Sequence, residues 1–360
     1  MKAIIVNTQV LDKIRAEGMT ANEAINAVYG EDIKAIKDER PELKDMKPMD
    51  IAFMSIGINS RTSTVGDILN KAYTTQGNGA DDLLFPVWQD SRVREAIEGI
   101  DLMRWAIASA PIGVDGGVTK GFTLDPYSPE NKKKLKRVRI AEGADIPTTK
   151  IKGGEVTVNL YKLGAAVETT YEAVRRMRIP LFKKTMDYIA RDVVRQEIDY
   201  IADTLVNGSG NNDKAEVILT TAAENKITND ELTEACFKYY LKTNVPPTTI
   251  MVGSEMGLSI AGMKFKDSEL DGVSNKIRLN IPQFGDMELT VLIADVEKVD
   301  GKNVAILYNN EQTIDKYVEN GSMVSETQKN IINQKNFATA SENVGFAIFL
   351  KGSNCLIKSA

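Results

Sequence analysis

The hydrophobic pattern is clearest between Arg178 and Gly210, where it predicts one long amphipathic helix. Apolar residues recur there at steps of three, four and once five positions: Phe182, Met186, Ile189, Val193, Ile198, Ile201 and Leu205. Pro180 suits a first helical turn, and Gly208 suits a helix end. Lys183 and Asp187 show opposite charges four residues apart on the other face. At ~1.5 Å per residue the helix would be roughly 40 Å long, enough to lie across a surface as a spine.

Before this helix, residues 1–82 predict a loosely packed N-terminal arm without a core of its own. Helices are expected at Thr8–Ala16, Thr20–Tyr29 and Thr64–Tyr73, and a strand at Ile51–Ile58. Thr20 and Glu23 have the spacing of a capping box. Residues 31–48 are charged and predict a linker, or a surface helix broken at Pro41. The stretch 74–82 is rich in glycine and polar residues and marks the boundary of the folded body.

A run of basic residues lies at 131–139. It places six cations in eight positions: Lys132, Lys133, Lys134, Lys136, Arg137 and Arg139. This patch could face phosphates or an acidic patch of a partner, and it could equally be a solvated face at the base of an extended loop. No aromatic residue interleaves with it, so base stacking is not indicated.

A protruding β-hairpin is predicted over residues 140–168. Val156 and Val158 begin a partly alternating strand, Gly153–Gly154 would form the turn, and Val138–Ile140 would be the partner strand. The tip is polar, at Thr148, Thr149, Lys150 and Lys152. Because an isolated two-stranded hairpin is only marginally stable, we expect this tip to rest on a neighbouring subunit.

After the long helix, residues 211–304 predict a compact α/β lobe. Its first helix would be capped by Asn229 or Asp230, with Leu232, Ala235, Cys236 and Tyr239 facing inward. A buried strand precedes Ser254, and Asp300–Gly301 is a two-residue hairpin turn. From Glu311 the pattern changes to long paired strands, with Asn320–Gly321 as a second hairpin turn. These strands are expected to pack beneath the long helix, covered by its apolar stripe.

The amino-acid composition limits which catalytic and metal-binding sites the chain could form. The 360 residues include no histidine, which removes Ser-His-Asp and Cys-His catalysis and HExxH zinc sites. No catalytic, metal or cofactor-binding residue is predicted, and no cofactor. Cys236 and Cys355 have no ligand spacing and are expected to be buried apolar groups. The net charge of −5 argues against a protein that coats nucleic acid over most of its surface. No apolar run approaches the ~20 residues that span a bilayer, so no membrane partner is expected.

The order of these elements resembles the major capsid protein of tailed bacteriophages, which has the Hong Kong-type capsid fold. The segments that carry the likeness are Glu142–Pro147, Thr169–Met177, Val206–Gly210, Thr249–Glu269, Asn280–Leu292 and Glu342–Lys358. Each is a generic strand or turn, and the ordered set carries the resemblance over residues 83–360.

The resemblance implies an α+β fold with five parts. They are an N-terminal arm at 1–82, an approach to the peripheral domain at 83–139, an extended loop at 140–168, a peripheral domain at 169–210 and 311–349, and an α/β axial domain at 211–310 and 350–360. The arm would either lace subunits together or be cleaved off as a scaffolding stretch.

The resemblance also implies a function without catalysis. The chain would assemble with itself, as hexamers and pentamers, into the closed icosahedral head shell around packaged double-stranded DNA. Further implied partners are scaffolding, portal and decoration proteins, with non-specific contact between the inner face and DNA. The protein would be assembled in the host bacterial cytoplasm and reside in the virion. Some relatives join subunits covalently through a lysine and an asparagine, assisted by a glutamate. The corresponding candidates here are Lys150 or Lys152, Asn333 or Asn336, and Glu342. For these residues we predict plain polar contacts and no cross-link.

Two other functions stay open. An encapsulin nanocompartment is built from similar subunits around a cargo enzyme, but encapsulin-like chains start near their first helix, so the long N-terminal arm favours the viral version. An α/β enzyme could use the lobe at 211–304. Its motifs are weak, because Gly208–Ser209–Gly210 lacks the Gly-Lys-Ser/Thr ending of a phosphate loop, and Ser254 has neither the spacing of a nucleophile elbow nor a histidine to activate it.

Overall fold

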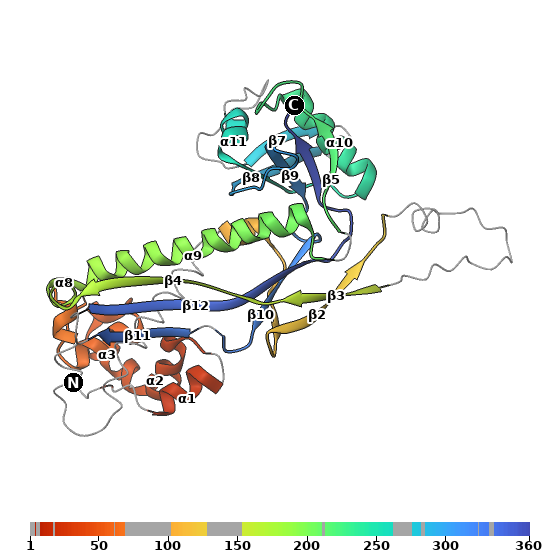
Figure 1. Ribbon diagram of the computed structural model, residues 1–360. Coiled ribbons are helices and arrows are strands. Elements are labelled where there is room, and N and C mark those ends of the chain that lie inside the picture. The colour runs from red at the N-terminus through yellow and green to blue at the C-terminus, as the bar shows by residue number, and fades with distance from the viewer. Residues whose placement is uncertain are drawn as a thin grey trace. The chain divides into compact units, whose positions relative to one another are not determined.

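The computed structural model describes residues 4, 8–16, 19–60, 62–68, 102–127, 153–210, 213–261, 276–281, 285–322, 324–330 and 335–360 (Figure 1). By their contacts, residues Met1–Ile100, Lys162–Val194 and Gly321–Glu342 form unit 1, and residues Asp101–Tyr161, Arg195–Asn320 and Asn343–Ala360 form unit 2. Both units contain helices and strands, and the predicted α+β class is confirmed.

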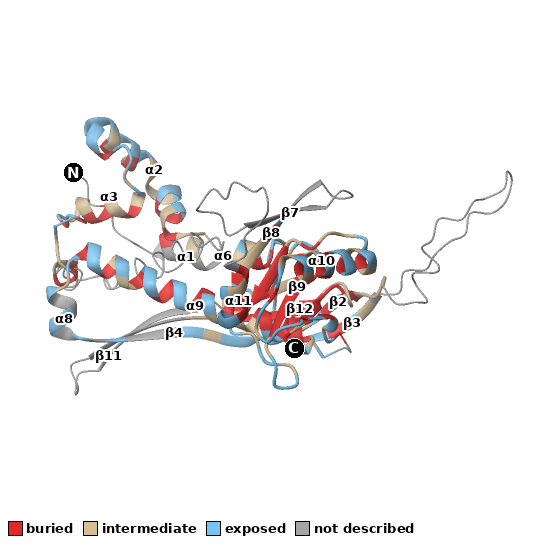
Figure 2. Ribbon diagram, turned by 90° about the horizontal axis from the view of Figure 1, so that it is seen from above, coloured by how far each residue is buried: buried red, intermediate tan, exposed pale blue. Residues whose placement is uncertain are grey.

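The predicted long helix is α9 (Ile179–Asn207), with 29 residues. Pro180 is its second residue, and Gly208 follows it with a φ of +83°, in the left-handed region that favours glycine. All seven residues of the predicted stripe are buried, and the two sides of the helix differ clearly in burial (Figure 2). The amphipathic pattern is therefore confirmed. The first part of α9 belongs to unit 1, and the part from Arg195 belongs to unit 2.

The N-terminal part of unit 1 is helical. It contains α1 (Thr8–Ala16), α2 (Ala21–Glu39), the 3₁₀ helix η1 (Pro41–Leu43) and α3 (Pro48–Ser55). The predicted capping box is present: Glu23 N donates to Thr20 Oγ1 at 3.3 Å, and Thr20 N donates to Glu23 Oε2 at 2.9 Å. The strand predicted at Ile51–Ile58 is wrong. Pro48 starts a helix there, because its fixed φ suits a first turn.

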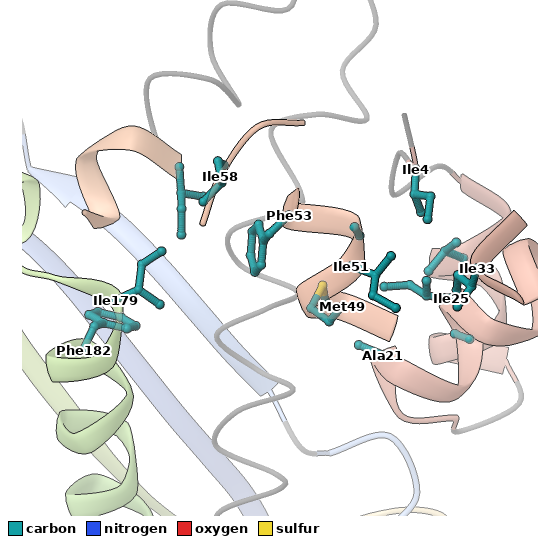
Figure 3. Close-up of a cluster of buried hydrophobic side chains, with 14 of the residues drawn as sticks. Ile4, Ala21, Ile25, Ile33, Met49, Ile51, Phe53, Ile58, Ile179 and Phe182 are labelled. Carbon is teal, nitrogen blue, oxygen red and sulfur yellow. The ribbon is translucent and has the colours of Figure 1, made fainter. Parts of the chain in front are cut away.

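The N-terminal helices share one hydrophobic core. Buried residues of segment 4–68 include Ile25, Ile33, Met49, Ile51, Phe53, Ile58 and Ile68, and Ile179, Phe182, Met186 and Ile189 of α9 belong to the same cluster (Figure 3). The expectation of an arm without its own core is therefore wrong. The first half of the α9 stripe, which was expected to cover the strands of 311–349, packs with this N-terminal segment.

Polar contacts fasten the N-terminal segment to the same part of α9. Lys183 Nζ lies 3.4 Å from Asp50 Oδ1, and both side chains are largely shielded from solvent. Just before the helix, Val65 N donates to Met177 O at 2.9 Å. Residues 4–68 and the start of α9 thus form one packed body.

The strand predicted to return beneath the long helix is β12 (Lys335–Ile348). It pairs with β4 (Tyr161–Thr170), which leads into α8 (Tyr171–Arg176), and with β10 (Ile314–Glu319) and β11 (Val324–Asn330). β10 pairs antiparallel with one end of β12, Ile314 opposite Ile348, and β11 with the other, Val324 opposite Ser341. β10 and β11 do not pair with each other in the described sheet. The hairpin predicted at Asn320–Gly321 is therefore wrong: Gly321, with a φ of +72°, interrupts two strands that pair with successive stretches of β12.

Unit 2 contains a six-stranded sheet in the order β5-β13-β9-β6-β8-β7. The strands are β5 (Glu216–Thr220), β6 (Thr249–Val252), β7 (Lys276–Ile281), β8 (Gly285–Ile293), β9 (Val304–Tyr308) and β13 (Cys355–Lys358). Its central strands are buried, with α10 (Asn229–Thr243) and α11 (Ser254–Ala261) in the same unit (Figure 2).

Local predictions in this lobe mostly hold. Leu232, Ala235, Cys236 and Tyr239 are buried as predicted. The N-cap of α10 is Thr228, not Asn229 or Asp230, because Thr228 and Glu231 form a capping box. Asp300–Gly301 forms a turn, with φ values of 52° and 74°. Around this turn only an isolated bridge between Val299 and Lys302 is present, so the predicted turn is confirmed but the paired strands of the predicted hairpin are not formed.

The strand at the start of the predicted hairpin has a different partner. β3 (Gly153–Asn159) pairs antiparallel with β2 (Val118–Leu124) and includes Gly153 and Gly154, so the turn predicted at these glycines is wrong. The predicted partner strand Val138–Ile140 lies outside the described residues. Val156 and Val158 pack against Tyr317 and Ala347 of unit 2 itself. The described base of the hairpin therefore rests on its own unit. Unit 2 also contains α6 (Leu102–Ala106) and β1 (Ile112–Val114), which pairs parallel with β10.

This packing makes Gly345 a sensitive position. A Cβ atom there would lie 2.8 Å from both Asn159 O and Leu160 Cδ2. We expect Gly345→Ala to lower the free energy of unfolding by about 1–3 kcal/mol through overpacking, measured by chemical denaturation. Gly117→Ala is the matched control, because its Cβ would meet nothing within 4 Å. Equal stabilities of the two variants would contradict this close approach of β3 and β12.

Candidate interaction surfaces

The site residues predicted from the sequence lie outside the described residues. They are the basic run of Lys132, Lys133, Lys134, Lys136, Arg137 and Arg139, and the loop-tip residues Thr148, Thr149, Lys150 and Lys152. Both groups stay predictions.

The loop after α9 does not have the chemistry of a phosphate site. Ser209 N donates to Asp213 Oδ1 at 3.0 Å, and Ser209 Oγ donates to the other carboxylate oxygen of the same residue. Asp213 is buried, so its carboxylate would repel an anion at close range. The loop instead fixes the path of the chain as it leaves the helix.

Ser254 is the first residue of α11, beside an amide–carboxylate network. Glu255 Oε2 accepts hydrogen bonds from Asn225 Nδ2 at 2.8 Å and from Asn303 Nδ2 at 2.7 Å. Glu255 and Asn303 line a hollow of about 330 Å³ that Arg195 and Asp199 also line. Because Asp199 Oδ1 accepts from Asp295 N at 2.7 Å, its carboxylate also has a structural use. Among the described residues, no group of three His, Cys, Asp or Glu side chains could hold a metal ion.

The two cysteines are buried, as predicted, and both are free thiols. Burial raises the pKa of the Cys236 thiol to about 12 and that of Cys355 to about 11. The reactive thiolate form is therefore scarce near neutral pH. Both residues serve as small apolar groups of the lobe core.

Across the described ranges, no helix is long and apolar enough to cross a membrane. Exposed large apolar side chains are nevertheless present in both units. In unit 1 they are Leu181 and Tyr188 on α9. In unit 2 they are Ile112, Val118, Phe122, Tyr161, Val217, Phe237, Leu241, Leu258 and Ile293. Where such side chains gather beside polar groups, they indicate a surface that contacts another protein.

One such place is a groove between strand β5 and helix α10, which we call the β5–α10 groove. Its volume is about 420 Å³, and it is lined by Val217, Ile218, Leu219, Thr220, Ala222, Glu231, Glu234 and Lys238. Phe237 and Leu241 of α10 are also exposed, but they are not among the residues that line the groove. β5 is an edge strand of the six-stranded sheet, so a ladder of backbone groups borders this groove.

The groove carries fixed charges. Glu234 pairs with Lys238 at 2.8 Å, and Glu231 also lines the groove. A second pair, Glu216 with Lys242 at 2.8 Å, joins the same two elements outside the groove lining. Burial acts to raise the pKa of the Glu231 carboxyl, but hydrogen bonds from Ala222 N and from Thr228 hold that pKa below its ordinary value. Glu231 is therefore ionised at neutral pH, and the groove has one carboxylate more than it has ammonium groups.

This groove was not predicted from the sequence. A partial signal was available in α10, because Phe237 and Leu241 fall outside the inward stripe of Leu232, Cys236 and Tyr239. The position of β5 at the edge of the sheet depends on long-range strand order, which no local pattern contains.

No family model matches this chain, and no curated protein matches its sequence. Its fold is similar to several solved structures. The capsid of an empty GTA particle is 14% identical with a TM-score of 0.48, covering 72% of this chain and 89% of that one. The capsid of cyanophage P-SCSP1u is 11% identical with a TM-score of 0.44, covering 71% and 87%. A virus-like particle from Pyrococcus furiosus is 9% identical with a TM-score of 0.43, covering 75% and 97%.

Proposed function

We propose that this chain is the major capsid protein of a tailed bacteriophage, a structural subunit that assembles with itself into an icosahedral head shell around double-stranded DNA. The observation that carries the proposal is the order of elements along the chain. After the N-terminal helices come the two-stranded sheet of β2 and β3, then the 29-residue α9, then strands β5–β9 with α10 and α11, and then the long strand β12. Strand β13 follows β12 and completes the six-stranded sheet. The segments that resemble capsid proteins in sequence occur in this same order.

The chemistry of the described residues supports a structural function. The candidate serines have no histidine to activate them, and the carboxylates around them accept hydrogen bonds from neighbouring amides. Exposed apolar side chains on both units supply surface for subunit contacts. Identical subunits in a closed shell would contact each other head to tail, through different patches on the two sides of each interface.

The finer assignments belong to this proposal. Residues 140–168 would form the extended loop, 169–210 with 311–349 the peripheral domain, and 211–310 with 350–360 the axial domain. The shell would consist of hexamers and pentamers, and its partners would be scaffolding, portal and decoration proteins and the packaged DNA. The protein would reside in the virion after assembly in the cytoplasm of the host bacterium.

Electron microscopy of the purified full chain, expressed with and without its neighbouring genes, tests the proposal. We expect closed icosahedral shells, and DNA-filled particles when the packaging genes are present. Shells that enclose a cargo enzyme would favour the encapsulin function instead. A monodisperse monomer of about the 39.6 kDa chain mass, with no assembly under any condition, would contradict both shell functions.

A further inference from the structure

The first half of the apolar stripe on α9 is covered by residues 4–68, which we call the N-terminal segment. Ile179, Phe182, Met186 and Ile189 lie on consecutive turns of α9, and none of them is more than 5% exposed. All four belong to the cluster that the N-terminal segment fills (Figure 3). Because the segment and this part of α9 both lie in unit 1, the cover is a contact within one chain.

The N-terminal segment has little apolar surface left for a second partner. Among its described residues no large apolar side chain is exposed, and the exposed ones of the described chain begin at Ile112. Its outer surface carries charged side chains instead, such as Glu31, Lys34, Asp38 and Glu42. An arm that binds a neighbouring subunit needs exposed apolar anchors. The segment is therefore suited to its contact with α9 and not to lacing neighbours together.

Backbone hydrogen bonds fix the position of the segment at the start of α9. Val65 N donates to Met177 O at 2.9 Å, and Ile179 N donates to Ser63 O at 3.2 Å. The two bonds form an antiparallel bridge at the beginning of the helix. Apolar burial is not directional, but hydrogen bonds are, so together they specify one arrangement of the segment on α9.

We propose that the N-terminal segment is a permanent cover of α9, kept by its own subunit before and after assembly. It would shield the apolar stripe from other copies of the chain, because a large exposed apolar patch promotes association. The segment would then be neither an arm that laces neighbours nor a stretch that is removed. Its retention in particles rests on the proposed shell function, whereas the contact within one chain does not.

A cut in the backbone does not by itself break this contact. The buried side chains and the hydrogen bonds that hold the segment lie at residues 4–68 and 177–189, so a cut between these ranges leaves all of them in place. Release of the segment would uncover the stripe of α9 and also Ile25, Met49 and Phe53 of the segment itself. Exposing this apolar surface to water is unfavourable, so the cut segment should stay bound.

Cutting the full chain at a chosen place tests the inference. A protease recognition sequence is inserted within residues 74–82, and the cut protein is run on a size-exclusion column at a concentration at which it is unassembled. We expect the cut segment to elute with the rest of its chain, because the shared core holds the two pieces together. Separate elution of the segment from the wild-type subunit would overturn the inference.

Two adjacent substitutions on α9 provide the variant and its control. Phe182→Asp places a carboxylate in the shared core and should raise the released fraction at least about tenfold. Leu181→Asp, at a side chain that is 55% exposed, should release no more than the wild type. Thermal unfolding of the uncut variants checks that each one folds, and Phe182→Ala takes the place of Phe182→Asp if that variant does not. Equal release from the two positions would overturn the contact.

Purified particles test whether the cover is permanent. Intact mass spectrometry of their protein should give the full chain of 39.6 kDa. A mass that lacks the N-terminal segment would overturn its retention. If the cut segment stayed in particles but left the unassembled subunit, a neighbouring copy would be holding it, and the inference would be wrong. Wild-type chain that never assembles would overturn the proposed shell function, while the column experiment would still decide the contact within one chain.

Discussion

Replacing Lys316 with methionine should lower the free energy of unfolding by about 3–5 kcal/mol. Lys316 Nζ lies 2.7 Å from Glu197 Oε2, and their side chains are only 13% and 2% exposed. Taking Glu197 out of water is costly, and the ammonium group offsets part of that cost. The variant keeps most of the length of the side chain but removes the ammonium group, so the glutamate loses that compensation. Chemical denaturation monitored by circular dichroism measures the difference.

An exposed ion pair of nearly the same length provides the control. Lys120 Nζ lies 2.6 Å from Glu155 Oε2, but these side chains are 74% and 70% exposed. Lys120→Met should therefore cost less than about 1 kcal/mol. In a second step, Glu197→Leu combined with Lys316→Met should recover most of the lost stability, because no charge is then buried. A single Lys316→Met variant as stable as Lys120→Met would show that the Glu197 charge is solvated.

Replacing Phe182 with alanine should lower the free energy of unfolding of unit 1 by about 3–5 kcal/mol. Phe182 is buried in the core that α9 shares with the N-terminal helices, so its removal leaves a cavity in that core. Hydrogen exchange should also become faster in residues 21–55, because their packing against α9 is weakened.

The adjacent Leu181 supplies the matched control for this position. It is 55% exposed on the same turn of α9, and Leu181→Ala should change stability by no more than about 0.5 kcal/mol. If Phe182→Ala left exchange in residues 21–55 unchanged, the N-terminal segment would not be packed on α9 as the structure describes.

Much of the local structure could be predicted from the sequence because its signals are local. The stripe on α9, the capping box of Thr20 and Glu23, and the turn at Asp300–Gly301 each depend on residues a few positions apart. The strand predicted at Ile51–Ile58 was wrong because a short apolar run without a clear period is compatible with either a strand or a helix. Pro48, three positions earlier, was the signal that favours the helix.

The failures in strand pairing have another cause. Asn320–Gly321 has the residues of a hairpin turn, but β10 and β11 both pair with β12 instead. β3 likewise pairs with β2, which lies about thirty residues earlier in the sequence and was not predicted as its partner. In each case packing over a long sequence separation decides between partners that look equivalent locally. The β5–α10 groove was missed for the same reason, since it exists only because β5 is last in the strand order.

The position of β13 has a consequence for the order in which the lobe of unit 2 folds. β13 lies between β5 and β9, and it is the only described strand that pairs with β5. Residues 216–220 are synthesised long before residues 355–358, and until the later segment inserts, β5 has no strand to hold it in register. The lobe therefore folds late, through contacts that are distant in sequence. Strand β5 is thus held in place only in chains whose C-terminal segment has already been synthesised and inserted.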